Sequence, residues 1–365
     1  MNDEEYLQEL QQLRNLSDST LSRYKIDLKH YTKYTGMTLE QLLEEADDEE
    51  EQRIRMRKRK IKTHMLGLQQ QLLTYNFEPS TVKTILSRIK AFYRTYDIEI
   101  PQIRTVGKES TETLEDIPTL EHIRVASSTN NLKHKALILF MASSGTGSKE
   151  TLNITVQDFI DATSDYHHET NIQNVLDVLS NKKNIIPTFH LRRFKTNHNY
   201  YTFCSPEASE AILMYLKTRK NLKPDSKLFD ITGKGLVMVF QRINEKYNWG
   251  WKKTRRFFHA HSMRMFFATQ LTKAGLDYLI IQWLSGRAVP ATTATYFKPS
   301  PDKLKKEYMK VVDKVSVSKV DVYDVKSEEF MHIEETNKAL SSKVEKLEQE
   351  MKLIQKAHEI EKNQS

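Results

Sequence analysis

Apolar residues recur every three to four positions along most of this chain, and this spacing constrains the fold more than any other feature. The segment from Pro79 to Tyr96 is the clearest case, with aliphatic and aromatic residues along one face of an expected helix. Only 10 glycines and 9 prolines interrupt the 365 residues. Two short strands are also expected, from Ile185 to Leu191 and from Tyr200 to Phe203. The sequence therefore predicts a mainly α fold with a small β-hairpin or sheet, in the α+β class.

Composition restricts the kinds of partner and the cellular compartment that we expect for this protein. The net charge of +8 and the pI near 9.1 favour a polyanionic partner. The single cysteine, Cys204, rules out an internal disulfide framework and fits a reducing compartment. No cysteine and histidine cluster has the spacing of metal ligands, so no metal or cofactor is expected. No apolar run approaches the roughly 20 residues of a membrane helix, and we expect a soluble protein of the cytoplasm or nucleus.

Changes in composition divide the chain into segments. Gly107 and a mixture of serine, threonine and glutamate between Pro101 and Asp116 are typical of a linker. The expected segments are a flexible N-terminus (1–14), a helical domain (15–105), a linker (106–117), a second domain (118–312), another linker (313–326) and a C-terminal helix (327–361).

A block of acids is followed at once by a block of bases. Asp47 to Glu51 are all acidic, and seven of the ten residues from Arg53 to Lys62 are basic. The acidic block is suited to the start of a helix, and the basic block to its body and end. The basic run would then contact DNA phosphates. A solvated helix face or a sorting signal would explain it equally simply.

The stretch from His261 to Tyr296 carries the clearest chemistry. His261 and Arg264 are three residues apart at the start of an expected helix, so both side chains leave the same face. A second helix from Tyr278 to Leu284 ends at Ser-Gly, which presents Arg287, and Tyr296 follows nine residues later. Two arginines, a histidine and a tyrosine on consecutive short elements are suited to a phosphate held by fixed positive charge.

His-x-x-Arg, then Leu-Ser-Gly-Arg, then a tyrosine resemble the catalytic half of the tyrosine recombinases, the phage-type integrases. The resemblance covers residues 15–312 and implies a helical core-binding domain followed by a catalytic domain. It implies site-specific DNA integration or excision through a 3′-phosphotyrosyl intermediate, with Tyr296 as nucleophile. Arg264 and Arg287 would hold the phosphate, and His261 would serve as general acid or base, or as a hydrogen-bond donor to the same phosphate. Lys195, in the turn between the expected strands, would be the general acid for the leaving oxygen.

The resemblance also implies partners and a setting. These are double-stranded DNA attachment sites, a homotetramer assembled on two duplexes, and the cytoplasm of a prokaryote or of a virus's host. A virus or a mobile element would be the source, and the Gly-Thr-Gly-Ser-Lys-Glu and Leu-Ser-Gly-Arg boxes favour an archaeal-type branch. Neither a membrane nor a cofactor is implied.

One position departs from the family pattern. The segment SSGTGSKETL resembles the first-arginine box, but Gly147 occupies the place of the arginine. Lys149 is the nearest cation and would replace a bidentate fork by a point charge. Two rival functions therefore stay open. One is a DNA-binding protein of the same fold with weakened or lost strand transfer, and the other is a nicking and rejoining enzyme of the topoisomerase or resolvase kind.

The C-terminal segment shows a heptad repeat. Ile333, Leu340, Leu347 and Ile354 occupy the d positions, and Asn337 lies at an a position. Four heptads with flanking charges predict a coiled coil, and an asparagine at a favours a dimer in fixed register. A single helix that folds back on the catalytic domain is the alternative.

Overall fold

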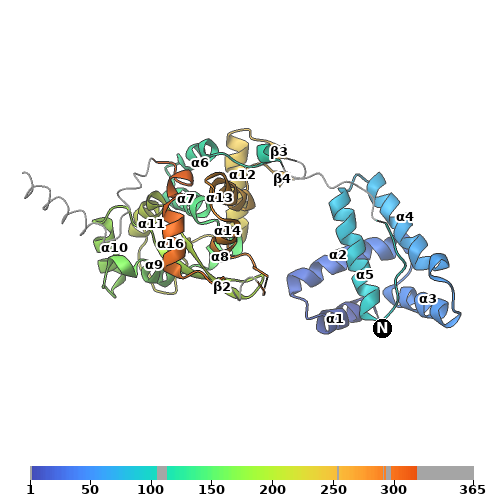
Figure 1. Ribbon diagram of the computed structural model, residues 1–365. Helices are drawn as coiled ribbons and strands as arrows, with labels where there is room; N and C mark the ends of the chain where they lie inside the picture. Colours follow the sequence, from blue (N-terminus) through green and yellow to red (C-terminus); the bar gives the residue numbers. More distant parts are fainter. Residues whose placement is uncertain (1, 105–112, 253–254, 291, 293–296, 319–365) are drawn as a thin grey trace, which may run out of the picture. The chain divides into compact units, whose positions relative to one another are not determined.

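The computed structural model describes residues 2–104, 113–252, 255–290, 292 and 297–318 of the chain (Figure 1). The chain divides into two compact units, residues 1–112 and residues 113–365. Both are helical, and the second contains a small antiparallel hairpin. The predicted mainly α fold with a small hairpin is therefore confirmed.

Unit 1 is a bundle of five α-helices around one apolar core. Its largest fully buried side chains include Tyr31, Tyr93 and Phe92, and the hydroxyl groups of the two tyrosines lie 3.1 Å apart. Gly36 ends α2 in the left-handed conformation, which a glycine adopts at low cost. The elements are α1 (Asp3–Leu13), α2 (Asp18–Thr35), α3 (Leu39–Glu51), η1 (Met56–Lys58), α4 (Lys60–Thr74) and α5 (Pro79–Thr95).

The expectation of a flexible N-terminus over residues 1–14 is wrong, because α1 occupies most of this segment. Asn2 and Glu5 form a reciprocal capping box at the start of α1. Leu7 and Leu10 are buried in the core of unit 1. Two leucines in a polar segment are a weak periodic signal, so tertiary packing decides this helix.

The expected position of the acidic block at a helix start is also wrong. The acids from Asp47 to Glu51 form the last turns of α3, and the basic run occupies the following turn, η1 and the start of α4. Tertiary contacts offset the unfavourable helix dipole. Both carboxylate oxygens of Glu49 accept from the backbone N–H of Lys60, at 3.0 Å each, and so cap α4. Arg59 is buried and forms an ion pair with Glu50.

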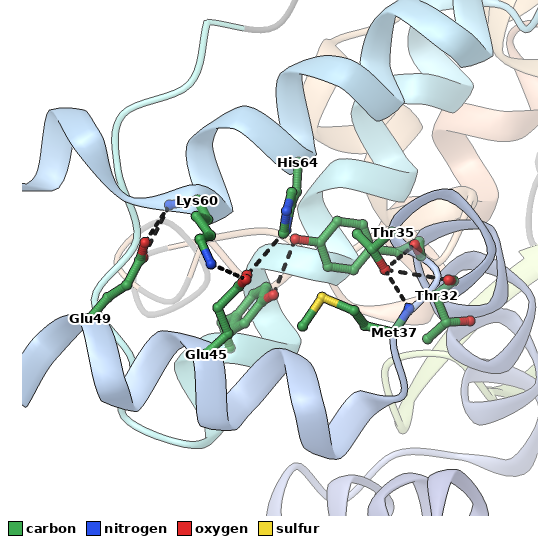
Figure 2. A network of polar contacts seen from close by, with 9 residues as sticks. Thr32, Thr35, Met37, Glu45, Glu49, Lys60 and His64 are labelled. Carbon is green, nitrogen blue, oxygen red and sulfur yellow. Dashed lines mark hydrogen bonds and ion pairs between the residues drawn. The ribbon is translucent and has the colours of Figure 1, made fainter.

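Figure 2 shows how the same helices are joined by a second acid. Glu45 accepts from the Lys60 ammonium at 2.8 Å, and its other oxygen lies 3.5 Å from Nδ1 of His64. In the same view, Thr35 caps the turn after α2 by accepting from the N–H of Met37 at 3.3 Å. The acidic block therefore holds α4 against α3. Of the basic run, Arg59 is buried and Lys62 is half-buried, and the other members are exposed.

Unit 2 is built around α7 (Leu132–Ser144). All residues from Ala136 to Ser144 are buried, and α7 contacts α6, α11 and α13. The other elements are η2 (Leu114–Asp116), α6 (Leu120–Ser127), α8 (Ser148–Asn153), α9 (Val156–Ala162), η3 (Ser164–Tyr166), α10 (Ile172–Ser180), β1 (Thr188–Arg193), β2 (His198–Phe203), α11 (Pro206–Lys217), α12 (Gly233–Lys246), β3 (Trp251–Lys252), β4 (Arg255–Arg256), α13 (Ala260–Lys273), α14 (Tyr278–Leu284), α16 (Pro301–Met309) and η4 (Val312–Lys314).

The first strand of the main hairpin begins and ends later than predicted, at Thr188 and Arg193, whereas the second begins earlier, at His198, and ends at the predicted Phe203. β1 pairs with β2 in antiparallel register, with Leu191 opposite Tyr200 and Arg193 opposite His198. Side chains alternate along β1, so Phe189, Leu191 and Arg193 leave one face. The first two are buried, and this face packs on the core. β1 therefore carries an arginine at its last inward-facing position.

Gly233 and Gly235 form the first turn of α12, where the Thr232 hydroxyl accepts from the N–H of Gly235. One smaller expectation is corrected. Residues 313–318, predicted to belong to a linker, pack on unit 2. Val315 is buried, and the N–H of Ser318 donates to Glu207 at 2.8 Å.

Cys204 follows β2 and is completely buried, with its sulfur 3.5 Å from the Ser209 hydroxyl. Burial raises the pKa of the Cys204 thiol to about 12. Among the described residues, no helix combines the length and hydropathy that crossing a membrane would require. The predicted coiled coil (327–361) lies outside the described residues.

Candidate active site

Arg264 is the centre of the site. It lies in the second turn of α13, and only 3% of its surface is exposed. Its guanidinium donates to the carbonyl oxygen of Gly145 at 3.0 Å and to that of Ser285. Gly145 ends α7 in the left-handed conformation, and Ser285 follows α14. One side chain therefore joins the end of α7, in the SSGTGSKETL segment, to the end of α14, in the Leu-Ser-Gly-Arg segment.

Charges of both signs surround this guanidinium. Burial, together with the positive charges of Arg193 and Arg287, lowers the pKa of Arg264 to about 10. Tyr200 and Glu150 oppose this shift. Arginine stays charged at neutral pH even so. Three guanidinium groups around one carboxylate leave net positive charge in this part of unit 2, which favours an anion.

Arg287 is presented by a tight turn. Gly286 has φ +57°, and a Cβ there would lie 2.6 Å from the ring of Tyr200. Glycine is thus required both for the backbone conformation and for the close approach of the aromatic ring. The N–H of Arg287 donates to the carbonyl of Gln282 at 2.9 Å, and its side chain is exposed.

His261 lies one turn before Arg264 on α13, but the two side chains differ in exposure. His261 is exposed, whereas Arg264 is buried. The imidazole of His261 has its centroid 6.3 Å from that of His259, the residue that caps α13 together with Ser262. The helix therefore places an imidazole at the surface and a guanidinium in the interior.

The two predicted lysines are both exposed. Lys195 lies in the turn of the hairpin, where Asn197 takes a left-handed conformation with φ 51°. Lys149 lies on the outer side of α8, while its neighbour Glu150 is buried. The first box thus turns a carboxylate toward the interior and an ammonium toward solvent.

The sequence interpretation missed two members of this cluster, Arg193 and Tyr200. Nη1 of Arg193 lies 3.5 Å from a carboxylate oxygen of Glu150. Within the described part of the chain, that nitrogen, the Tyr200 hydroxyl and the Ser285 hydroxyl are buried without a hydrogen-bond partner. The signal for Arg193 was the alternation along β1, which was hidden because the strand was expected to end at Leu191.

Tyr296, the predicted nucleophile, lies outside the described residues. α16, which follows it, is fixed to unit 2 by the buried Tyr308, whose hydroxyl donates to the Ser143 carbonyl at 2.8 Å. In the described residues, no group of three or more His, Cys, Asp or Glu side chains is placed to hold a metal ion.

The basic and aromatic run before α13 has two roles in the fold. Trp249 packs against Tyr247 and Phe258, with ring centroids 5.1 Å and 4.9 Å away. Trp251 is 60% exposed, and the guanidinium of Arg256 lies over its ring at 4.8 Å. The first tryptophan therefore serves the core, and the second offers an exposed aromatic face beside a cation.

The model of the phage integrase family matches residues 113–303, just over half of the chain. The match spans the first box, the hairpin and the whole stretch from His261 to Tyr296. The chain therefore belongs to the phage integrase family, and it is a site-specific recombinase of the tyrosine type. Membership of this family does not favour the alternative interpretation of the chain as a DNA-binding protein without strand transfer.

Curated relatives agree with this class. Tyrosine recombinase XerA of Saccharolobus solfataricus is 23% identical over 237 residues, which span 65% of this chain and 69% of that protein. This relative fits the predicted archaeal-type branch. Tyrosine recombinase XerC of Leptospira interrogans is 29% identical over 115 residues, 30% of this chain and 36% of that protein.

Two solved structures share the fold. A lambda integrase dimer bound to a COC′ core site has a TM-score of 0.51 at 11% identity, covering 81% of this chain and 95% of that one. The XerH site-specific recombinase bound to a palindromic difH substrate has a TM-score of 0.50 at 16% identity, covering 80% of each chain.

Proposed function

We propose that this recombinase cuts and rejoins DNA at specific attachment sites with Tyr296 as the nucleophile. The observation that carries the proposal is the buried guanidinium of Arg264, fixed by two backbone carbonyls and close to the charges of Arg193 and Arg287. Fixed cations in a water-poor site stabilise an anionic transition state more than they stabilise the substrate. The tyrosine supplies the covalent chemistry, and the arginines supply the electrostatic stabilisation.

The cleavage step has a simple balance of bonds and protons. The phenolic oxygen of Tyr296 forms a bond to phosphorus, and the bond from phosphorus to the 5′ oxygen breaks. A free tyrosine has a pKa near 10, so its proton must leave as the new bond forms, and His261 accepts it. Lys195 gives a proton to the leaving 5′ oxygen. Rejoining reverses these steps with a different 5′ hydroxyl group.

The arrangement of charges supports a DNA partner in both units. Unit 1 exposes part of its basic run, and unit 2 exposes Arg287, Lys195 and Lys149 around the buried cluster. Cations on exposed positions neutralise phosphates without reading sequence. The proposed substrate is double-stranded attachment-site DNA, held by the core-binding domain (15–105) and the catalytic domain (118–312).

Exchange between two duplexes requires four strand cuts, and each subunit offers one proposed nucleophile, Tyr296. The proposed assembly is therefore a homotetramer on DNA in the cytoplasm of a prokaryote or viral host, with the predicted C-terminal coiled coil joining pairs of subunits. Integration or excision of a mobile element or virus would be the outcome.

Covalent capture tests the reaction without knowledge of the attachment site. The full chain is incubated with a pool of duplexes that have a degenerate central segment and one nick each. The nick lets the short cleaved strand diffuse away, so protein–DNA adducts accumulate and can be sequenced. We expect adducts that share a sequence, and none with Tyr296→Phe. Adducts that persist in Tyr296→Phe would overturn the choice of nucleophile, and bound duplexes without adducts would overturn strand transfer.

A further inference from the structure

We propose that Arg193, from the end of β1, takes the place of the arginine that the first box lacks and donates to a non-bridging oxygen of the scissile phosphate. This inference rests on the proposed function and adds a residue to its site. The first box has Gly147 at the position of the expected arginine, so the guanidinium must come from another element.

The position of Arg193 follows from the hairpin. It is the last residue of β1, on the same face as the buried Phe189 and Leu191, and it pairs across the strands with His198. Arg192, one residue earlier, lies on the opposite face and donates to the side-chain oxygen of Asn197 at 2.8 Å. Strand alternation thus turns one of two adjacent arginines toward Arg264 and the other toward solvent.

The first box holds Arg193 by its carboxylate. Glu150 is 7% exposed, and one of its oxygens lies 3.5 Å from Nη1 of Arg193. A Cβ at Gly147 would lie 2.3 Å from the other oxygen of the same carboxylate. The glycine therefore leaves the room that Glu150 occupies. The box that has lost its own arginine orients an arginine from β1 instead.

The cluster has polar groups that form no hydrogen bond within the described part of the protein, although Nη1 of Arg193 lies at ion-pair distance from Glu150. Nη1 of Arg193, the Tyr200 hydroxyl and the Ser285 hydroxyl are buried without a hydrogen-bond partner in the described residues. Tyr200 interacts electrostatically with Arg193, Arg264 and Glu150, so its hydroxyl belongs to the same cluster. Buried donors are rarely left unpaired in proteins. An oxyanion such as a phosphate would accept from several of them at once.

Two competing roles lead to different outcomes. If Lys149 replaces the missing arginine, removing the Lys149 side chain should slow cleavage more than removing that of Arg193. If Arg193 only stabilises the fold through Glu150, its loss should slow the cleavage of charged and neutral substrates by the same factor. Lys149 is exposed on α8, whereas 18% of the Arg193 side chain is exposed, and the buried position gives the stronger electrostatic effect.

Anion binding tests the site independently of recombination. Tungstate, a tetrahedral oxyanion, is titrated into the full chain by calorimetry. We expect Arg193→Ala to weaken tungstate binding about 10-fold or more, the effect of losing one charge-assisted contact. Lys149→Ala should weaken it less than Arg193→Ala does, and the matched surface variant Arg124→Ala should change it little. Absence of binding by the wild-type chain, or equal binding by Arg193→Ala, would overturn the site.

Cleavage of a modified phosphate tests the role in the reaction. In a captured duplex, a methyl group replaces one non-bridging oxygen, which removes the negative charge that an arginine neutralises. On the ordinary duplex we expect Arg193→Ala to slow adduct formation about 100-fold. Arg192→Ala should slow it much less. On the neutral duplex, the rates of adduct formation by Arg193→Ala and the wild type should differ less. An unchanged difference in rate would mean that Arg193 has a structural role and would overturn the proposal.

Arg193→Lys keeps a positive charge beside Glu150 and guards against misfolding of the alanine variant. It should fold like the wild type yet cleave more slowly, because an ammonium cannot donate a bidentate fork. The two proposals fail separately. If the wild-type chain binds tungstate through Arg193 but forms no adduct, only the proposed strand-transfer reaction is overturned. If Arg193→Ala forms adducts at the normal rate, only the proposed role of Arg193 is overturned.

Discussion

The guanidinium of Arg264 donates to the carbonyl oxygen of Gly145, 119 positions earlier in the chain, across 3.0 Å. The bond joins α13 to the C-terminal end of α7, and a second bond from the same group reaches Ser285. Arg264 is therefore part of the fold as well as of the proposed chemistry. Its substitution should affect stability before any DNA is added.

Arg264→Lys should lower the free energy of unfolding by about 1–3 kcal/mol, because a lysine cannot satisfy both buried carbonyls. Urea denaturation measures this change. Arg219 offers a matched control, since it also donates to two backbone carbonyls, those of Lys227 and Leu228, but in a less buried setting. Arg219→Lys should cost less. Equal losses for the two variants would show that the burial of Arg264 contributes nothing.

Gly286→Ala should be strongly destabilising. The new Cβ would meet the Tyr200 ring at 2.6 Å, in a backbone conformation with φ +57° that costs an L-residue about 1 kcal/mol. Overpacking typically adds about 1–3 kcal/mol. Gly250 has φ +69° but nothing within 4 Å of its Cβ position, so Gly250→Ala should carry the backbone cost only. Thermal denaturation of both variants separates the two effects, and a similar loss in both would refute the role of the ring.

Gly147→Ala should reduce adduct formation more than stability. Gly147 has an ordinary φ of −80°, so alanine brings no backbone strain. Its Cβ would displace the Glu150 carboxylate and hence the guanidinium of Arg193. Gly233→Ala is the control, because its nearest atom is 3.7 Å away at normal contact distance. Rates of adduct formation are compared at a temperature at which the wild type and both variants are fully folded. Wild-type rates in Gly147→Ala would argue that Glu150 does not position Arg193.

Lys195→Ala should slow cleavage about 100- to 10,000-fold if the lysine is the general acid. A duplex whose leaving 5′ oxygen is replaced by sulfur tests the cause, because a thiolate leaves without protonation. The variant should cleave this duplex nearly as fast as the wild type does. A deficit of the same size on both duplexes would assign Lys195 to DNA binding instead, which gel-shift titrations would then show.

Local signals were sufficient for most helices. α14 begins and ends at the predicted residues, Tyr278 and Leu284, and α5 begins at the predicted Pro79 and ends one residue before the predicted Tyr96. In each, an apolar period coincides with a strong start signal, the capping Asp277 for α14 and a proline in the first turn for α5. Agreement between period and start signal makes such helices readable from sequence alone.

Tertiary contacts decided the elements that the sequence could not show. The acidic block was expected to begin a helix, but it ends α3 because Glu49 caps the next helix through Lys60. Arg193 was overlooked because pairing with β2 extends β1 beyond its apolar residues. Both depend on contacts with the next element along the chain, which local propensity does not register. Tyr296 stays a prediction from motif spacing.

The burial of Cys204 has a practical consequence for following this protein in solution. A thiol reacts with maleimides or disulfide reagents through its thiolate, and a pKa of about 12 leaves almost none of that form near neutral pH. Complete burial also excludes the reagent. Because the chain has no other cysteine, modification of its thiol should occur only when unit 2 opens. The labelling rate would therefore report opening of that unit, and a dye attached to an introduced surface cysteine would mark a single position.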